Sequence, residues 1–350
     1  MIWFIIFAAS MAGLISLGNE SVCIIFLIIR RMFAMPRLVR EWGKRSYWKV
    51  NQDQGLLNEI VLPPNDEKRL FNLCYTLSLG RKRRAPLRNI LIYGPSGCGK
   101  TLLAKTIAKS AKNMPYALMS GSDLSPLGRE GPSELRQVIL WATKQKHGGI
   151  IIIDEAEIAL GSRLKVNNHS PDHVNDFTES REHEALNASR DALNVFLSMT
   201  GDTEAHCMII LTTRDPRVLD AAVLDRCDEL VYLNNPSIDQ RYKILHLEFM
   251  KRFEPRRTKN SIYDLIFCDN KLVIYDIKFD YVKRINELAG NNITMGFSGR
   301  ELCKIIKAVH SEACFCDSNL LNDSTWIIVI KRMCDSIKAK KAIKGNNKVL

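Results

Sequence analysis

Residues 94–101 restrict the possible folds of this 350-residue chain more than any other segment. They read G-P-S-G-C-G-K-T, follow the apolar run Ile90–Tyr93, and precede the helix-like residues 102–108. The spacing G-x-x-x-x-G-K-[ST] lets backbone N–H groups surround phosphate oxygens, and the following helix points its positive end at them. A plain strand–turn–helix without a ligand is the alternative. The order strand, loop, helix favours a nucleoside triphosphate site.

The residues of this loop predict binding of ATP together with Mg²⁺. Lys100 would reach the β- and γ-phosphates, and the Thr101 hydroxyl would be a ligand of the metal. The residues expected to bind the nucleotide here are Gly94, Pro95, Ser96, Gly97, Cys98, Gly99, Lys100, Thr101 and Leu102.

Two acidic residues follow a second apolar run, at residues 150–153. Four consecutive isoleucines indicate a strand that is buried on both faces. We expect Asp154 to hold Mg²⁺ and Glu155 to act as general base toward the water that attacks the γ-phosphate. The alternative is a pair of capping acids at the start of the next helix. The phosphate loop upstream favours the catalytic interpretation.

A third apolar run, Cys207–Thr213, ends in two hydroxyl side chains. Ligands of open parallel sheets bind at the carboxyl ends of the strands, so Thr213 is expected to sense the γ-phosphate. Between residues 85 and 253 strands alternate with helices, which predicts an α/β fold with a parallel sheet covered on both faces. Residues 254–350 predict a small helical lid and a basic tail, with a hairpin-like element near residues 262–275 and helices at 281–289, 298–313 and 324–339.

These motifs resemble the AAA ATPases, and in particular the mitochondrial inner-membrane family called ATPase family AAA domain-containing protein 3. The similarity runs from about residue 31 to residue 337. Its most specific segments are residues 86–95, 119–131, 225–229 and 296–301. The resemblance implies a P-loop NTPase module of the AAA type that assembles into a homo-oligomeric ring, expected to be a hexamer.

The resemblance also implies roles for two arginines. Arg226 would be the arginine finger, which stabilises charge on the transferring phosphoryl group in the neighbouring subunit. Arg300 would contact the γ-phosphate from the lid of its own subunit. If the resemblance is set aside, Arg226 has an alternative role in a surface ion pair with Asp225 or Asp228. Arg300 would then be an ordinary helix residue beside Glu301. Residues 125–131 match the loop that faces the central pore of AAA rings, although a simple β-to-α connection explains the same residues.

The sequence departs from the family at two places. Arg214 stands where the family usually has an asparagine that positions the attacking water. A guanidinium cannot accept a hydrogen bond from water, so slow or absent ATP hydrolysis is an alternative to efficient turnover. In a second alternative, Thr213 takes the place of the asparagine in positioning the water. Residues 161–184 form a polar insertion with three histidines, whose spacing fits no common zinc site. The long coiled coil that the family carries before its anchor is missing, which suggests a reduced or incomplete member.

The amino terminus predicts a membrane segment. Residues 1–17 and 22–29 are apolar and together long enough for a bilayer, for which about 20 residues suffice. One tilted span, a span with an interfacial piece and a signal peptide are the alternatives. Neither a basic start nor a cleavage site supports the signal peptide. Residues 30–49 are basic with interleaved aromatic residues, which is typical of a membrane-interface belt on the positive side.

The distribution of charge favours anionic lipid over nucleic acid as a partner. The chain has 50 basic and 38 acidic residues, a net charge of +12, yet residues 89–250 carry 17 basic and 21 acidic residues. The excess therefore lies in the belt, in residues 81–84 and in the tail after residue 331. Nucleic acid is expected to bind at most indirectly or non-specifically.

The chain is accordingly expected to have four parts: an anchor and belt at 1–49, a linker with one amphipathic helix at 50–84, the α/β domain at 85–253 and the lid with its tail at 254–350. The expected function is a membrane-anchored ATPase on the matrix side of the mitochondrial inner membrane that remodels protein or nucleoid complexes, with an unknown protein substrate. A nucleotide-gated scaffold is the first alternative. A membrane protease is the second, but the zinc motif H-E-x-x-H is missing.

Overall fold

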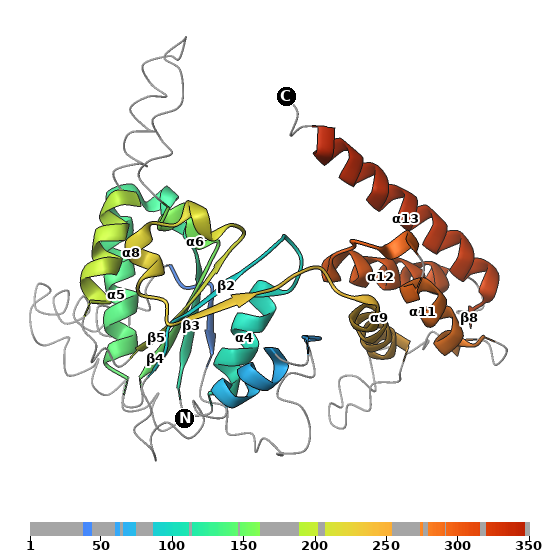
Figure 1. Cartoon of the computed structure of the whole chain (residues 1–350), viewed down its shortest axis with the longest axis horizontal. Helices are drawn as coiled ribbons and strands as arrows, with labels where there is room; N and C mark the ends of the chain where they lie inside the picture. Colours follow the sequence, from blue (N-terminus) through green and yellow to red (C-terminus); the bar gives the residue numbers. More distant parts are fainter. Residues whose placement is uncertain are drawn as a thin grey trace, which may run out of the picture.

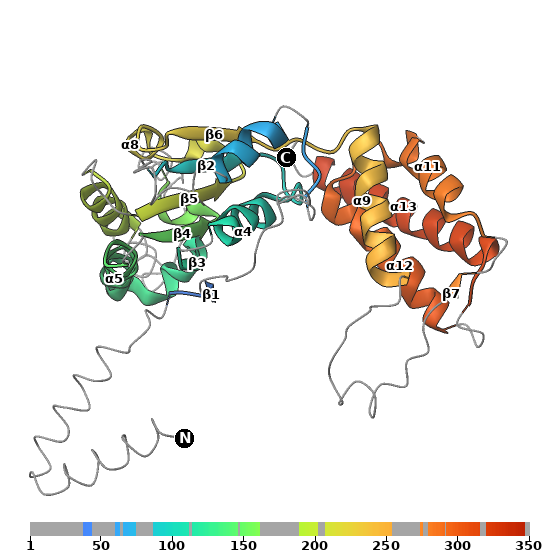
Figure 2. The same cartoon turned by 90° about the horizontal axis from the view of Figure 1, so that it is seen from below.

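The computed structural model describes residues 38–43, 60–63, 66–74, 87–111, 114–145, 148–161, 189–201, 207–253, 274–275, 279–290, 292–315 and 320–346. These residues form an α/β part and a separate helical part, which lie side by side in Figures 1 and 2. The α/β part is built on a six-stranded sheet with the order β1-β3-β4-β5-β2-β6. Its strands are β1 (Glu41–Gly43), β2 (Ile90–Tyr93), β3 (Tyr116–Ser120), β4 (Gly149–Asp154), β5 (Cys207–Thr213) and β6 (Glu229–Tyr232).

The sheet is parallel except at one edge. Strands β3, β4, β5, β2 and β6 run parallel to their neighbours, whereas β1 pairs antiparallel with β3. Within residues 85–253 all described strands are parallel, as predicted, whereas β1, from outside that range, adds an antiparallel edge strand that was not predicted. This strand comes from the chain before the α/β domain and covers backbone groups of β3 that would otherwise form an open edge.

Side chains at alternate positions of the apolar strands pack into two separate hydrophobic cores, one on each face of the sheet. Ile90, Ile152 and Ile210 pack on the face covered by α4 (Lys100–Ser110) and by the helix at residues 66–74. Their sequence neighbours pack on the opposite face, under α5 (Gly131–Thr143) and the other helices of the α/β part. The latter are α6 (Ala156–Ala159), the helix at residues 189–199 and α8 (Ala221–Leu224). Burial on both faces explains why these strands lack polar residues until their ends.

The lid is a bundle of four helices with its own core. They are α9 (Ile238–Phe253), α11 (Tyr281–Gly290), α12 (Gly299–Phe315) and α13 (Asp323–Asn346). Helices α11 and α12 lie within two residues of the predicted positions, and α13 starts as predicted but runs seven residues further. Helix α9 belongs to this bundle and not to the α/β domain, because its side chains Leu245, Phe249 and Phe253 are buried in the lid core. In addition, buried Arg241 donates two hydrogen bonds, of 3.0 and 2.8 Å, to the carbonyl of Ala289 in α11. The lid therefore begins near residue 238 and not at residue 254.

The predicted hairpin-like element lies largely outside the described residues. Its described part, β7 (Ile274–Tyr275), pairs in parallel with β8 (Leu320–Leu321). Sequence proximity suggested a local pairing, whereas the lid brings in a partner from beyond α12.

The predicted membrane segment at residues 1–29 also lies outside the described residues, as does most of the insertion at residues 161–184. Within the part of the chain that is described, no helix has the length and apolar character needed to cross a bilayer. The expected belt at residues 30–49 includes β1, which is part of the α/β domain. Trp42 packs edge-on against Trp141 of α5, with ring centroids 4.5 Å apart, and Arg40 forms an ion pair with Asp123.

Candidate functional site

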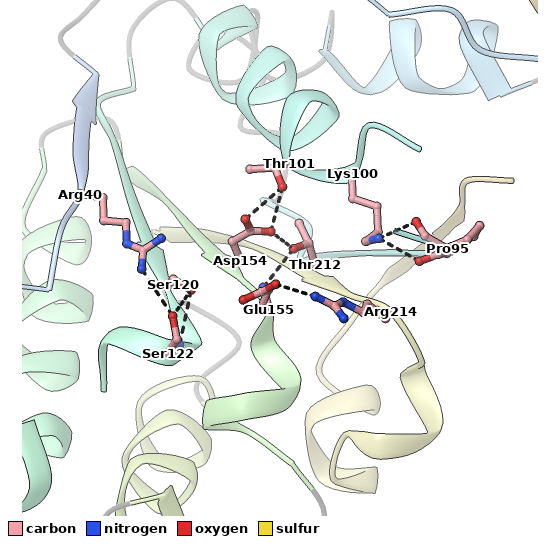
Figure 3. Close-up of polar contacts among 11 residues, drawn as sticks. Arg40, Pro95, Lys100, Thr101, Ser120, Ser122, Asp154, Glu155, Thr212 and Arg214 are labelled. Atoms are coloured by element: carbon pink, nitrogen blue, oxygen red, sulfur yellow. Dashed lines mark hydrogen bonds and ion pairs between the residues drawn. The ribbon is translucent and has the colours of Figure 1, made fainter. Parts of the chain in front are cut away.

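The phosphate loop connects β2 to α4 at the carboxyl end of the sheet. Gly94 and Gly97 have φ values of 145° and 84°, which favour glycine, and a β-carbon on Gly94 would clash with the carbonyl oxygen of Leu233. The Lys100 ammonium lies inside the curve of the loop, where it donates hydrogen bonds to the carbonyl oxygens of Gly94 (2.8 Å) and Pro95 (2.9 Å) (Figure 3). Burial lowers the pKa of Lys100. The loop thus holds one cation where phosphate oxygens are expected.

Asp154 lies next to this loop and accepts hydrogen bonds from two threonines. The Thr101 hydroxyl donates to both of its carboxylate oxygens, at 2.9 and 3.0 Å, and the Thr212 hydroxyl also donates to Oδ1. Figure 3 shows the three side chains converging from α4, β4 and β5. A hydroxyl beside a carboxylate at a phosphate loop is the oxygen donor set that Mg²⁺ prefers. The residues therefore fit the expected metal.

The sequence analysis did not single out Thr212, although a signal for it existed. Side chains alternate between the two faces of a strand. Met208 and Ile210 belong to the core on the α4 face, so Thr212 extends the same row toward Asp154. Thr213, the residue chosen from the sequence, is on the other row, and its hydroxyl donates to the carbonyl of Asp215 at 3.2 Å. Both threonines line the cleft beside the phosphate loop.

Glu155 occupies a strained backbone position next to Asp154. It has φ 51° and ψ 49°, the one left-handed residue other than glycine among those described, and its N–H donates to Thr212 Oγ1 at 3.3 Å. Such strain is concentrated at functional sites. The carboxylate forms an ion pair with Arg214, whose Nη2 lies 3.0 Å from Glu155 Oε1 (Figure 3). The expected base is therefore engaged by the very residue that departs from the family.

The lid forms the far wall of a cleft of about 520 Å³ that contains all these side chains. Arg300 lies in the first turn of α12, and its backbone N–H donates to the carbonyl of Gly97 at 3.0 Å. Cys303 lies one turn further along and also lines the cleft. Arg300 thus lines the cleft, and the contact with the γ-phosphate that the resemblance implies stays a prediction.

The lining of the cleft also includes apolar residues that the sequence analysis did not identify. Ile60 and Val61, from the segment before the α/β domain, lie there with Ile244 of α9. A pocket whose lining combines apolar side chains with phosphate ligands suits a nucleotide base joined to a phosphate chain. Nothing in the composition of residues 60–61 marks them, because their position depends on the fold.

Arg226 is set apart from these residues. Within the described part of the chain it lies outside the cleft, just after α8, and its Nη1 donates to the carbonyl of Ala222 at 3.1 Å. Its Nε is buried and has no hydrogen-bond partner among the described residues. The surface ion pairs with Asp225 or Asp228 considered from the sequence are not found among these residues. Arg226 therefore does not act on the cleft of its own chain in this conformation.

The expected pore loop lies between β3 and α5. Residues Ser125–Glu130 form a short 3₁₀ segment, η2, which is interrupted at Gly128 (φ 49°, ψ −122°). The preceding turn η1 (Gly121–Asp123) contacts the residue just before the edge strand β1, because Arg40 Nη2 lies 2.6 Å from Asp123 Oδ1. Arg40 was assigned to the membrane belt from the sequence, and the fold places it here instead.

Comparison with known proteins agrees with this architecture. Residues 90–235 match the model of the family described as "ATPase family associated with various cellular activities (AAA)". This stretch covers five of the six strands of the sheet, β2 to β6, together with the phosphate loop and both acidic residues. The α/β part of the chain is therefore an AAA ATPase domain, a class of domain that binds nucleotides.

Over most of its length the chain is also similar to proteins named ATPase family AAA domain-containing protein 3, as expected from the sequence. It is 32% identical over 308 residues to the protein of that name from Caenorhabditis elegans, which is 85% of this chain and 47% of that protein. The protein from Xenopus tropicalis is 30% identical over 307 residues, 87% of this chain and 46% of its own length. ATPase family AAA domain-containing protein 3A from Homo sapiens is 29% identical over 308 residues. The chain spans a little under half the length of these relatives.

Proposed function

We propose that this chain is an Mg²⁺-dependent ATP hydrolase. The observation that supports this proposal best is the convergence of Lys100, Thr101, Asp154 and Glu155 on one cleft closed by the lid. Backbone N–H groups of the loop and Lys100 would bind the β- and γ-phosphates, and Ile60, Val61 and Ile244 would contact the base. Thr101 and Asp154 would hold Mg²⁺, which neutralises phosphate charge when bound. Glu155 would accept a proton from the attacking water.

Phosphate release from Mg²⁺-ATP by the purified chain tests this proposal. Sustained release that depends on Mg²⁺ is the expected result. Binding of ATP without release would favour the second function considered below, and failure to bind ATP would overturn both.

We further propose that the active form is a homo-oligomeric ring, expected to be a hexamer, in which Arg226 acts on the neighbouring subunit. The position of Arg226 outside its own cleft supports this assignment. An arginine supplied in trans makes turnover depend on assembly. The proposal includes attachment to anionic lipid at the mitochondrial inner membrane, with the AAA domain in the matrix and protein or nucleoid complexes as targets. The apolar and basic residues at the amino terminus support this part.

Light scattering with and without ATP should detect the ring. Exchange of Arg226 for alanine is expected to lower turnover by at least about tenfold while ATP affinity stays unchanged, because the guanidinium would act only on charge that develops in the neighbouring site. Arg217→Ala, an exposed arginine close by, serves as control. A monomer under both conditions would contradict the role in trans.

The second candidate function is a nucleotide-gated scaffold that hydrolyses little ATP. The ion pair between Arg214 and Glu155 favours it, because a carboxylate held by a guanidinium is less able to orient and deprotonate water. Arg214→Asn should release Glu155 and place the usual residue of the family beside the γ-phosphate. We expect turnover to rise about tenfold. Arg217→Asn is the matched control, and a fall in turnover with Arg214→Asn would show that the arginine assists the reaction.

A further inference from the structure

The last turns of helix α13 contact the loop that leads into helix α12. Lys341 donates a hydrogen bond from Nζ to the carbonyl of Gly296 at 2.8 Å and lies 3.1 Å from Glu301 Oε2. The same ammonium lies over the ring of Phe297, 4.5 Å from its centroid. One lysine therefore binds three groups around the start of α12: a backbone carbonyl and a buried aromatic ring of the loop, and an acidic side chain in the first turn of the helix.

Glu301 is the residue that shapes the start of α12. Its Oε2 accepts hydrogen bonds from the backbone N–H of Ser298 at 2.7 Å and from the Ser298 hydroxyl at 3.0 Å. The Ser298 hydroxyl in turn accepts a 3.4 Å hydrogen bond from the backbone N–H of Glu301, which completes a capping box. Lys341 binds the same carboxylate oxygen as Ser298. The lysine thus helps to fix the side chain that caps the helix.

The capped turn is in direct contact with the phosphate loop. The Arg300 N–H donates to the Gly97 carbonyl at 3.0 Å, and a β-carbon on Gly97 would lie 3.0 Å from Ser298 Oγ and 3.2 Å from the β-carbon of Arg300. A shift of this turn would therefore move the lid away from the loop. It would also displace Arg300 and Cys303, which line the cleft.

We propose that Lys341 is a positioning residue that holds the first turn of α12, and with it Arg300, against the phosphate loop. Lys341 does not line the cleft, so it acts on bound nucleotide only through this turn. The carboxyl-terminal helix thereby sets nucleotide affinity, and neutralisation of the lysine charge weakens ATP binding. This inference rests on the proposed binding of ATP in the cleft.

We expect the loss of Lys341 to change ATP affinity more than folding, because its side chain is partly exposed. The Lys341 side chain is 40% exposed, and ion pairs of this kind contribute little to the free energy of unfolding. The lid core, including Trp326 of α13, is buried independently of the lysine. Loss of Lys341 should therefore leave the lid folded but release the turn that touches Gly97.

The test compares three variants of the full chain in binding of a fluorescent ATP analogue. Lys341→Met keeps most of the apolar stem and removes the charge, Lys341→Arg restores a cation, and Lys340→Met removes a neighbouring exposed charge. We expect affinity to fall about fivefold for Lys341→Met and to be largely restored for Lys341→Arg. The control Lys340→Met should bind as the unchanged chain does. Trp326 fluorescence and the unfolding temperature without nucleotide should be alike in all three.

A double variant tests whether the lysine acts through Arg300. In the background of Arg300→Ala, Lys341→Met should have little further effect on affinity. The effects of two substitutions on binding free energy are not additive when one residue acts through the other. Full additivity, or unchanged affinity of Lys341→Met, would overturn the inference. So would an equal loss of affinity in Lys340→Met. If the unchanged chain itself binds no ATP, the proposed function fails instead, and the two failures are thereby distinguished.

Discussion

Replacing Lys100 by alanine is expected to weaken ATP binding about a hundredfold. Removal of a charged partner from a half-buried site costs about 3 kcal/mol, which corresponds to that factor. The loop carbonyls of Gly94 and Pro95 that Lys100 now binds would also lose their donor. Calorimetric titration with ATP and Mg²⁺ measures the change directly.

Lys109→Ala is the matched control for this prediction. Lys109 lies in the last turn of the same helix, α4, and is exposed. The Lys109→Ala variant should bind ATP with the affinity of the unchanged chain. Retention of ATP affinity by Lys100→Ala, together with an unchanged unfolding temperature, would refute the assignment of the phosphate loop.

Replacing Glu155 by glutamine is expected to lower ATP turnover about a hundredfold or more while ATP still binds. The amide has nearly the same shape but cannot accept the proton of the attacking water. It would also lose the ion pair with Arg214, so a small change in affinity is compatible with the prediction. The measurement is the rate of phosphate release at saturating Mg²⁺-ATP.

The control is Glu287→Gln, the same exchange on the exposed face of α11. Its turnover should match that of the unchanged chain. Equal turnover for Glu155→Gln and the unchanged chain would mean that Glu155 is not the base, and it would remove the enzyme interpretation in favour of the scaffold.

The parts of the site predicted from the sequence are those built from contiguous residues. The phosphate loop lies between β2 and α4 as predicted because spacing, glycines and the flanking apolar run are all local signals. Asp154 and Glu155 were found for the same reason, at the end of a run of isoleucines. Local sequence therefore identified the residues that contact Lys100 and Thr101.

Contacts between distant segments were harder to predict. The pairing of Arg214 with Glu155 depends on how β5 is placed beside β4. The apolar part of the cleft lining depends on how the fold places residues 60–61 and α9. Helix α9 was assigned to the α/β domain because it follows β6 without a break in pattern. Its buried face matches the lid core, and a hydrophobic pattern alone does not identify the partner it packs against.

The antiparallel strand β1 has a mechanical consequence. It joins the sheet beside β3, and β3 continues into η1 and the interrupted 3₁₀ segment η2. A force applied to the chain before Leu38 would therefore act first on β1 and, through its pairing, on β3. The loop that would face a ring's central channel follows β3 directly in the sequence. The ion pair between Arg40 and Asp123 would transmit part of the same force directly to η1. Traction on the amino terminus and movement of that loop would thus be coupled through the edge of the sheet.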